Sequence, residues 1–365
     1  MGKISQIGIL TGGGDCPGLN AVIRAIAKTA ISSYGLEVIG FIDGFKGMVE
    51  NRYIQLDSRI VSGISHTGGT ILGTSNRDNP FKYFTISEGT AHHSDESDRA
   101  ISNLQHLGLD GLIVIGGDGS LHIANQFNEK GVSVVGVPKT IDNDLMGTDV
   151  TFGFNTAVNT ASEALDRLHT TAESHHRVMV LEVMGRYAGW IALHAGISGG
   201  ADVILIPEIP YKIDAVISKI SERYRQGKNF SIIVVAEGAL PENGEMVIRN
   251  LVSTSHDPIR LGGIGQKVAE DIGERLNNIE IRVTVLGHLQ RGGSPIPYDR
   301  ILSTRYGVAA VEAFMKEKYG TMVSLQGNEI TTVPIKEAIK EIRKVKPDSD
   351  LVQAARGVGI SFGDL

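Results

Sequence analysis

Cysteine is almost absent from this sequence, because Cys16 is the only one among 365 residues. A disulfide framework and a zinc site made of cysteines are therefore excluded. Basic charge is not in excess either, since 35 Lys and Arg face 41 Asp and Glu and leave a net charge of −6. Without a basic field, we expect no nucleic-acid partner and no binding to a membrane surface. An anionic substrate would need a local cluster of Arg and Lys.

Long hydrophobic runs are also missing. No run approaches the roughly 18 apolar residues that span a membrane, so no transmembrane helix is expected. The N-terminal stretch MGKISQIGIL has too short an apolar part for a secretory signal and leads directly into a strand pattern. Gln6 breaks the N-terminal myristoylation pattern. We therefore expect a protein of a reducing compartment, most simply the cytoplasm.

Short apolar runs alternate with amphipathic stretches along most of the chain. This alternation predicts an α/β fold with parallel-rich sheets flanked by helices, and the length predicts two domains. The predicted strands are Ile7–Leu10, Glu37–Ile42, Gly111–Ile115, Val132–Val137, Arg177–Val183, Val203–Ile206, Ser231–Ala236 and Arg282–Leu286. The predicted helices include Leu19–Ser32, Asp98–Gly108 and Asn155–Thr171.

Two of the predicted strands end in a Gly-Gly-Asp turn, at residues 12–15 and 116–119, which suggests two loops that line one crevice. Glycines before a helix start let backbone N–H groups approach an anion. The first loop matches neither the Walker pattern nor G-x-G-x-x-G, because Pro17 stands at the third glycine position. A phosphate loop and a simple tight turn both remain open. Cys16 is better explained as a small buried residue than as a nucleophile.

Asp118 stands among glycines at the end of a buried strand. Its carboxylate could bind a metal ion, accept a hydrogen bond from a ribose, or cap the following helix. Further along, the stretch PKTIDNDLMGTD holds Asp142 and Asp144 beside Lys139. One carboxylate could act as a base while the other shapes the site, and the lysine suits a phosphate. The alternative is a turn rich in Asp and Asn for local reasons.

Basic residues recur at predicted strand ends and would form an anion site if they converged. The alternative for each residue alone is a solvated surface charge. Glu237 ends another apolar strand, where it could hydrogen-bond a sugar hydroxyl or simply belong to a turn. The basic residues in question are Arg177, Arg186, Arg282, His288 and Arg291.

Taken together, these segments closely resemble the phosphofructokinase family. The resemblance rests on motifs in family order from about residue 7 to residue 306, namely LTGGGDCPGLNAVIRA, GGTILGTS, VIGGDGS, PKTIDND, EVMGRYAG, PE at 207–208, AEG and VLGHLQRGGSPIPYDR. It implies two lobes with the active site in the cleft between them, and phosphoryl transfer to the 1-hydroxyl of fructose 6-phosphate. The lobes are expected at residues 1–153 plus 290–340 for the donor and 154–289 plus 341–365 for fructose 6-phosphate.

The resemblance also implies roles for individual residues. Asp118 would hold Mg²⁺, Asp142 would be the general base beside Thr140, and Arg186 would steady charge on the transferring group. The implied donor contacts are Gly14, Arg77, Gly117, Gly119, Ser120 and Lys139. The implied substrate contacts are Thr140, Asp144, Arg177, Met184, Gly185, Arg186, Glu237, Arg282, His288 and Arg291. Arg177 and Arg282 would reach in from a neighbouring subunit of a homodimer or homotetramer.

The phosphoryl donor is a separate question. Pyrophosphate-using members resemble this chain at Lys139 but carry Asp at the place of Gly119, whereas the best-known ATP-using members carry Gly at both places. A side chain at residue 119 would crowd the α-phosphate of ATP, so ATP is the expected donor and pyrophosphate the alternative. NAD kinases and diacylglycerol kinases share a GGDG turn, but their resemblance would stop near residue 120. A non-catalytic sugar-phosphate or nucleotide sensor would be expected to lack Asp118 or Asp142.

Overall fold

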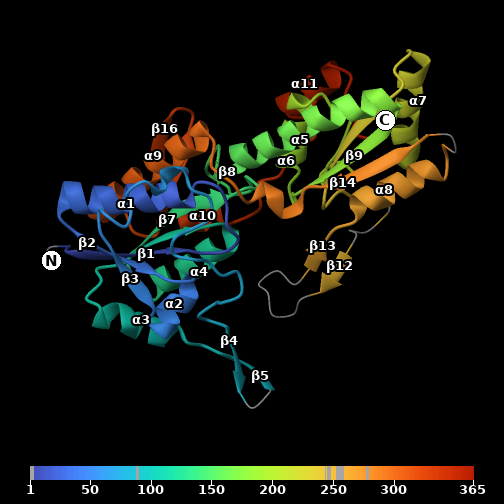
Figure 1. The fold of residues 1–365 in the computed structure, drawn as a ribbon. Coiled ribbons are helices and arrows are strands. Elements are labelled where there is room, and N and C mark those ends of the chain that lie inside the picture. Colours follow the sequence, from blue (N-terminus) through green and yellow to red (C-terminus); the bar gives the residue numbers. More distant parts are fainter. Residues whose placement is uncertain (1–3, 88–89, 243, 245–247, 252–258, 277–278) are drawn as a thin grey trace.

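Two β-sheets with flanking helices lie at opposite ends of an elongated molecule in the computed structural model (Figure 1). The structure describes residues 4–87, 90–242, 244, 248–251, 259–276 and 279–365. This mixed α/β architecture with parallel-rich sheets confirms the predicted fold class.

The first sheet has the strand order β16-β15-β7-β6-β1-β2-β3, with β8 paired to β7. Its inner strands pair in parallel, and antiparallel pairing occurs at its two edges, in β2–β3 and β15–β16. β1 pairs with β2 on one side and with β6 on the other, so the strand order changes direction at β1. Such a change in direction opens a crevice at the carboxyl ends of the strands. The strands are β1 (Gln6–Thr11), β2 (Glu37–Phe41), β3 (Tyr53–Leu56), β6 (Leu112–Gly116), β7 (Val134–Thr140), β8 (Phe152–Gly153), β15 (Thr321–Gln326) and β16 (Glu329–Pro334).

The second sheet has the order β10-β11-β9-β14, and all of its pairings are parallel. Strands β9 and β11 are buried along their whole length, as expected for parallel strands covered on both faces. β14 forms an edge of this sheet and is only partly buried. The strands are β9 (Val178–Val183), β10 (Val203–Leu205), β11 (Ser231–Ala236) and β14 (Ile281–Val285).

Helices cover both sheets and join their cores. One hydrophobic cluster runs from the first sheet to the second along α1, α5, α6 and α9, while separate clusters fill the opposite face of each sheet. Among the described helices, none is long and apolar enough to cross a membrane. The helices are α1 (Leu19–Tyr34), α2 (Phe45–Glu50), α3 (Ser97–His106), α4 (Asp118–Glu129), α5 (Phe154–His175), α6 (Trp190–Ser198), α7 (Ile213–Arg225), α8 (Ile264–Gly273), α9 (Pro297–Met315), α10 (Ile335–Ala338) and α11 (Asp350–Gly357), with the short 3₁₀ turns η1 (Ile64–His66) and η2 (Gly287–Gln290).

Every predicted strand is present, with its ends shifted by no more than three residues. The predicted helices are also present, as α1, α3 and α5. The sequence reading missed β3 and the hairpin β15–β16, which add antiparallel edges to the first sheet. It also missed two small hairpins, β4–β5 (Tyr83–Ser87 and Thr90–Ser94) and β12–β13 (Ile248–Leu251 and Ile259–Leu261). Apart from β15, which is largely buried, these strands have polar residues between their apolar ones and so lack the apolar runs on which the prediction relied.

Candidate active site

A cavity of about 780 Å³ opens where the carboxyl ends of strands from both sheets meet. Loops after β1, β6 and β7 form one wall, which we call the donor wall, and loops after β9, β11 and β14 form the other, which we call the acceptor wall. Predicted residues that line the cavity are Gly14, Arg77, Gly117, Asp118, Gly119, Ser120, Lys139, Thr140, Asp142, Asp144, Met184, Arg186, Glu237, His288 and Arg291. The two Gly-Gly-Asp turns thus lie in one crevice, as the sequence predicts.

The first glycine turn approaches its neighbours too closely for side chains. Gly13 adopts φ +80° and donates its N–H to the carbonyl oxygen of Ser75 at 3.0 Å. A Cβ atom on Gly14 would lie 2.7 Å from Nη1 of Arg291. The same Nη1 donates to the carbonyl oxygen of Asp15 at 3.1 Å, so the acceptor wall contacts the donor wall here. Cys16 is fully buried, as predicted, and burial raises the pKa of its thiol to about 12, which disfavours the reactive thiolate.

Asp118 is the first residue of α4, and its side chain does not cap that helix. The N-cap is Gly117, without a side-chain capping hydrogen bond. Instead Asp118 Oδ1 lies 3.4 Å from Nδ1 of His122 one turn later, and this contact raises the pKa of His122. The Asp118 carboxylate is 38% exposed and lines the cavity. Of the three interpretations, helix capping is therefore wrong, and cation binding and ribose binding remain.

The loop after β7 carries two carboxylates into the cavity. Thr140 Oγ1 accepts a hydrogen bond from the backbone N–H of Asp142 at 3.1 Å, and Asn143 adopts φ +53°. The Asn143 Oδ1 accepts from the N–H of Thr151 at 3.0 Å, which closes the loop. Burial and the charge of Asp142 raise the pKa of Asp144 to about 7. The Asp144 carboxyl group therefore titrates near neutral pH.

Lys139 lies beneath the first glycine turn and is 3% exposed. Its Nζ donates to the carbonyl oxygen of Gly14, and burial lowers its pKa. The lysine therefore helps to fix the turn, and its remaining donor capacity faces the cavity that it lines.

On the acceptor wall, the loops after β9 and β11 interlock. Gly238 donates its N–H to the carbonyl oxygen of Gly185 at 3.1 Å, and a Cβ at Gly238 would lie 1.9 Å from the carbonyl oxygen of Arg186. Burial, followed by the charge of Asp142, raises the pKa of Glu237 to about 7, while Arg186 opposes that shift. Gly185 itself, at φ +136°, does not line the cavity, although its neighbours Met184 and Arg186 do.

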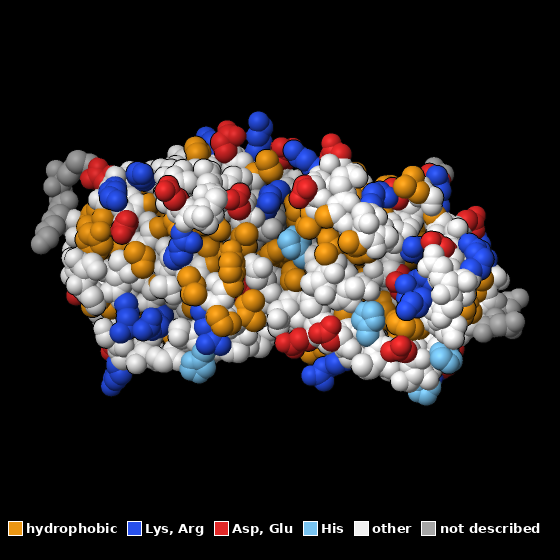
Figure 2. All heavy atoms as spheres, turned by 90° about the horizontal axis from the view of Figure 1, so that it is seen from above, with side chains coloured by type: hydrophobic (Ala, Val, Ile, Leu, Met, Phe, Trp, Pro, Cys, Tyr) orange, Lys and Arg blue, Asp and Glu red, His pale blue; other side chains and the backbone are white. Residues whose placement is uncertain are grey.

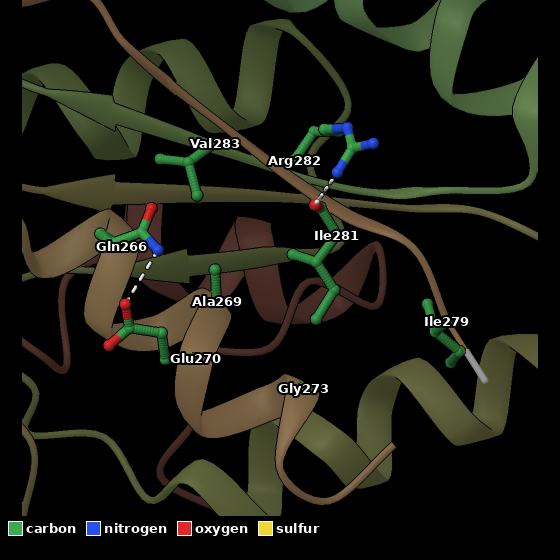
Figure 3. A pocket seen from close by; sticks show the side chains of 8 residues that line it. All are labelled: Gln266, Ala269, Glu270, Gly273, Ile279, Ile281, Arg282 and Val283. Atoms are coloured by element: carbon green, nitrogen blue, oxygen red, sulfur yellow. Dashed lines mark hydrogen bonds between the residues drawn. The ribbon is translucent and has the colours of Figure 1, made fainter. Parts of the chain in front are cut away.

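Besides Gly185, the predicted residues that do not line the cavity are Arg177 and Arg282. Both pair with Glu280, in the case of Arg177 through Nε at 2.7 Å. Arg282 instead lines a separate hollow of about 460 Å³ between α8 and the edge strand β14 (Figure 3).

Other residues that line the cavity were missed by sequence reasoning. Asp15 belongs to the first Gly-Gly-Asp turn and Asn76 adjoins Arg77, so both had a local signal. Phe45 and Ile123 come from helix faces, and Ile342 comes from the chain between α10 and α11, where no pattern marks them. The remaining members are Gly13, Ser75, Asp78, Asn79 and Tyr187.

Within the described residues, no three His, Cys, Asp or Glu side chains gather as a metal site. Mg²⁺, however, is usually held by one or two carboxylates together with phosphate oxygens and water. Asp118 offers such a carboxylate at the N-terminus of α4, which favours phosphate. The charge of Asp118 also contributes to the raised pKa of Asp144. The donor set thus fits a Mg²⁺ ion that is shared with a phosphate-bearing ligand.

A family model described as Phosphofructokinase matches residues 6–314, and the chain belongs to this family. It is 58% identical, over 100% of both chains, to ATP-dependent 6-phosphofructokinase 2 of Clostridium perfringens. It is also 49% identical to a pyrophosphate–fructose 6-phosphate 1-phosphotransferase of Streptomyces coelicolor, over 98% of this chain and 100% of that relative. Phosphofructokinase from Saccharomyces cerevisiae has a similar structure, with a TM-score of 0.79 and 32% identity over 92% of this chain and 45% of the yeast chain.

Proposed function

We propose that this protein is an ATP-dependent 6-phosphofructokinase. It transfers the terminal phosphoryl group of ATP to the 1-hydroxyl of fructose 6-phosphate and releases fructose 1,6-bisphosphate and ADP, a reaction of glycolysis in the cytoplasm. The observation that carries this proposal is the position of Asp142 in one cavity with a glycine-built donor wall and a charged acceptor wall. The full-length relative named ATP-dependent supports the choice of reaction.

The donor phosphates would lie against the two glycine turns. Backbone N–H groups at the start of α4 and the lysine and arginine of this wall would neutralise their charge, which is the main requirement of phosphoryl transfer. Asp118 would hold Mg²⁺, which supplies further neutralisation of the donor oxygens. The proposed donor contacts are Gly14, Arg77, Gly117, Gly119, Ser120 and Lys139.

The attacking hydroxyl would be placed at Asp142, whose carboxylate accepts its proton. Thr140 supports this role because its Oγ1 fixes the backbone of Asp142. Arg186 would stabilise the charge on the transferring group from the opposite wall. Asp144, with its raised pKa, would meet the sugar as a hydrogen-bond partner. General base catalysis of this kind contributes roughly 10²–10⁴-fold.

The sugar phosphate would be held by residues of the acceptor wall. Met184 and Glu237 would contact the sugar, Gly185 would shape the loop that carries Met184, and His288 and Arg291 would bind the 6-phosphate. Arg177 and Arg282 would complete the phosphate site of a neighbouring copy in a homodimer or homotetramer. Both arginines form ion pairs with Glu280 and lie outside the cavity of their own chain, which supports this assignment. Apolar side chains exposed at and just after β14 also support this assignment, because Val285 is 56% exposed and Leu289 is 68% exposed.

The two sheets also support the proposed lobes. The donor lobe, residues 1–153 plus 290–340, would contain the first sheet, and the fructose 6-phosphate lobe, residues 154–289 plus 341–365, would contain the second. The cavity would then be the cleft between the lobes.

Pyrophosphate is the competing donor, because Lys139 and the Streptomyces relative both favour it. Two features support ATP. Gly119 places no carboxylate beside the donor phosphates, and the donor wall continues to the apolar side chains of Phe45 and Ile123. A purine could extend along this part of the cavity, whereas inorganic pyrophosphate has no group to do so.

The test is the initial rate of fructose 1,6-bisphosphate formation with Mg²⁺, measured with ATP and with pyrophosphate in parallel. We expect turnover with ATP and little with pyrophosphate. Turnover with pyrophosphate alone would contradict the donor assignment and keep the family reaction. Inactivity with both donors would favour the non-catalytic sensor.

A further inference from the structure

Arg343 contacts the loop that carries the two cavity carboxylates, although it does not line the cavity. It lies in the segment between α10 and α11. Its backbone N–H donates to the carbonyl oxygen of Asp144 at 2.8 Å. Its Nη1 donates to the carbonyl oxygen of Asp149 at 2.7 Å and reaches that of Asn143 at 3.5 Å. One residue thus holds three carbonyl groups of the loop after β7.

The same residue contacts the opposite wall through Trp190, the first residue of α6. The Arg343 guanidinium carbon lies 4.7 Å from the centre of the Trp190 ring, and Trp190 Nε1 donates to the Arg343 carbonyl oxygen at 2.9 Å. Trp190 directly follows the loop of Met184 and Arg186. Glu208 reinforces the connection, because its Oε1 accepts from the N–H of Gly189 at 3.0 Å and of Val345 at 2.8 Å.

The loop after β7 needs such support. Asn143 adopts φ +53°, a backbone conformation that is costly for a residue other than glycine unless its surroundings hold it. An arginine suits this position because its planar guanidinium donates in its own plane while it stacks on an aromatic ring. The short distance to the Trp190 ring and the hydrogen bond to the Asp149 carbonyl oxygen are both present here.

We propose that Arg343 is a positioning residue, which fixes the loop after β7 so that Asp142 faces the acceptor, and ties this loop to Trp190. Arg343 thereby links the loop after β7 to α6, which directly follows the loop of Met184 and Arg186. This inference rests on the proposed function, in which Asp142 is the base. Arg343 acts through the loop and touches no reacting group.

Arg343→Met keeps apolar contact with Trp190 and removes the side-chain donors. We expect kcat to fall about 10²-fold, since a misplacement of about 1 Å has an effect of that size. KM for fructose 6-phosphate should change much less, because His288 and Arg291 lie on and beside η2, away from the Arg343 contacts. Arg343→Lys retains the charge without the planar fork and should give an intermediate kcat.

The matched control is Arg356→Met. Arg356 also stacks on an aromatic ring, Phe362 at 4.9 Å, and it pairs with Asp364 at 2.6 Å, but it does not line the cavity. This control should lose thermal stability and keep its kcat. Trp190 is the only tryptophan of the chain, so its emission reports the Arg343 contact directly. Emission and acrylamide quenching should change in Arg343→Met and stay unchanged in Arg356→Met.

The inference is overturned if folded Arg343→Met keeps a kcat within about twofold of the wild type, or if Arg356→Met loses as much kcat. If Arg343→Met does not fold, Arg343→Lys decides by the same criterion. A wild-type protein inactive with both donors would instead contradict the proposed function.

Discussion

The donor wall and the acceptor wall of the cavity are built in different ways. The donor wall contains two glycine turns, after β1 and β6, whose main chain is held by backbone hydrogen bonds and, in the first turn, by Lys139. The acceptor wall consists of side chains, among them Arg186, Glu237 and His288, from loops of the second sheet. A main-chain site suits a polyphosphate that every donor of the family shares, whereas side chains select one sugar.

The two walls also differ in completeness. The donor wall is formed by one chain, whereas Arg177 and Arg282 of the proposed phosphate site lie outside their own cavity. Basic and acidic side chains are interspersed over most of the face seen in Figure 2. Changes on the two walls should therefore have different kinetic signatures.

The largest effect is expected from Asp142→Asn, because the amide cannot accept the proton of the sugar hydroxyl. We expect kcat to fall roughly 10²–10⁴-fold. Binding of both substrates, measured by calorimetry, should be retained. Asp348→Asn, at an exposed position outside the cavity, is the control and should behave like the wild type. A near-normal kcat in Asp142→Asn would exclude Asp142 as the base.

Arg282→Ala should act on the acceptor side alone. Loss of a charge-assisted contact to phosphate would raise KM for fructose 6-phosphate about tenfold or more and leave KM for ATP unchanged. Arg275→Ala is a suitable control, because Arg275 is also exposed but contacts Asp214 instead of Glu280. Equal changes in both KM values would contradict the separation of the two walls.

Gly119→Asp should act on the donor side alone. A carboxylate at the start of α4 would repel and crowd the phosphates of ATP, so KM for ATP should rise several-fold while KM for fructose 6-phosphate stays constant. Gly357→Asp tests the same substitution at the end of α11, where an added Cβ meets no atom within 4 Å. If Gly119→Asp leaves KM for ATP unaltered, the argument from Gly119 to ATP fails.

The smallest effect concerns stability. The pKa of Asp144 is raised from 3.8 to about 7. A carboxyl group with a raised pKa lowers the free energy of unfolding progressively as pH rises from its ordinary pKa to its raised pKa. Above the raised pKa this loss of stability is complete. Asp144→Asn removes the charge, so its gain in Tm should be larger at pH 8 than at pH 5. An equal change in Tm at both pH values would show that Asp144 does not titrate in this way.

Local patterns predicted the donor wall well. Apolar runs predicted the buried strands, and the glycines after β1 and β6 predicted two loops in one crevice, because each of these signals lies within a few residues. Asp142, Arg186 and Glu237 were found at strand ends for the same reason. Their catalytic and binding roles came from the family resemblance and stay predictions.

Contacts between distant segments could not be predicted. After α10 the chain returns to this region, where Ile342 lines the cavity and Arg343 contacts the loop after β7, and no motif marks that return. Phe45 and Ile123 lie on amphipathic helices, where an apolar residue is normally part of the core. The position of Arg282 on an edge strand follows from sheet order, which a linear pattern does not contain.

The most direct test is a hybrid oligomer of the full chain. Asp142→Asn and Arg282→Ala chains would be co-expressed with different tags, the mixed species purified, and its rate measured at a fructose 6-phosphate concentration too low for Arg282→Ala alone. If one copy supplies the base and donor wall while its neighbour supplies Arg282, some mixed sites contain both native residues, and activity should exceed that of either parent. Activity no higher than the average of the parents would place Arg282 in its own chain's site and contradict the account.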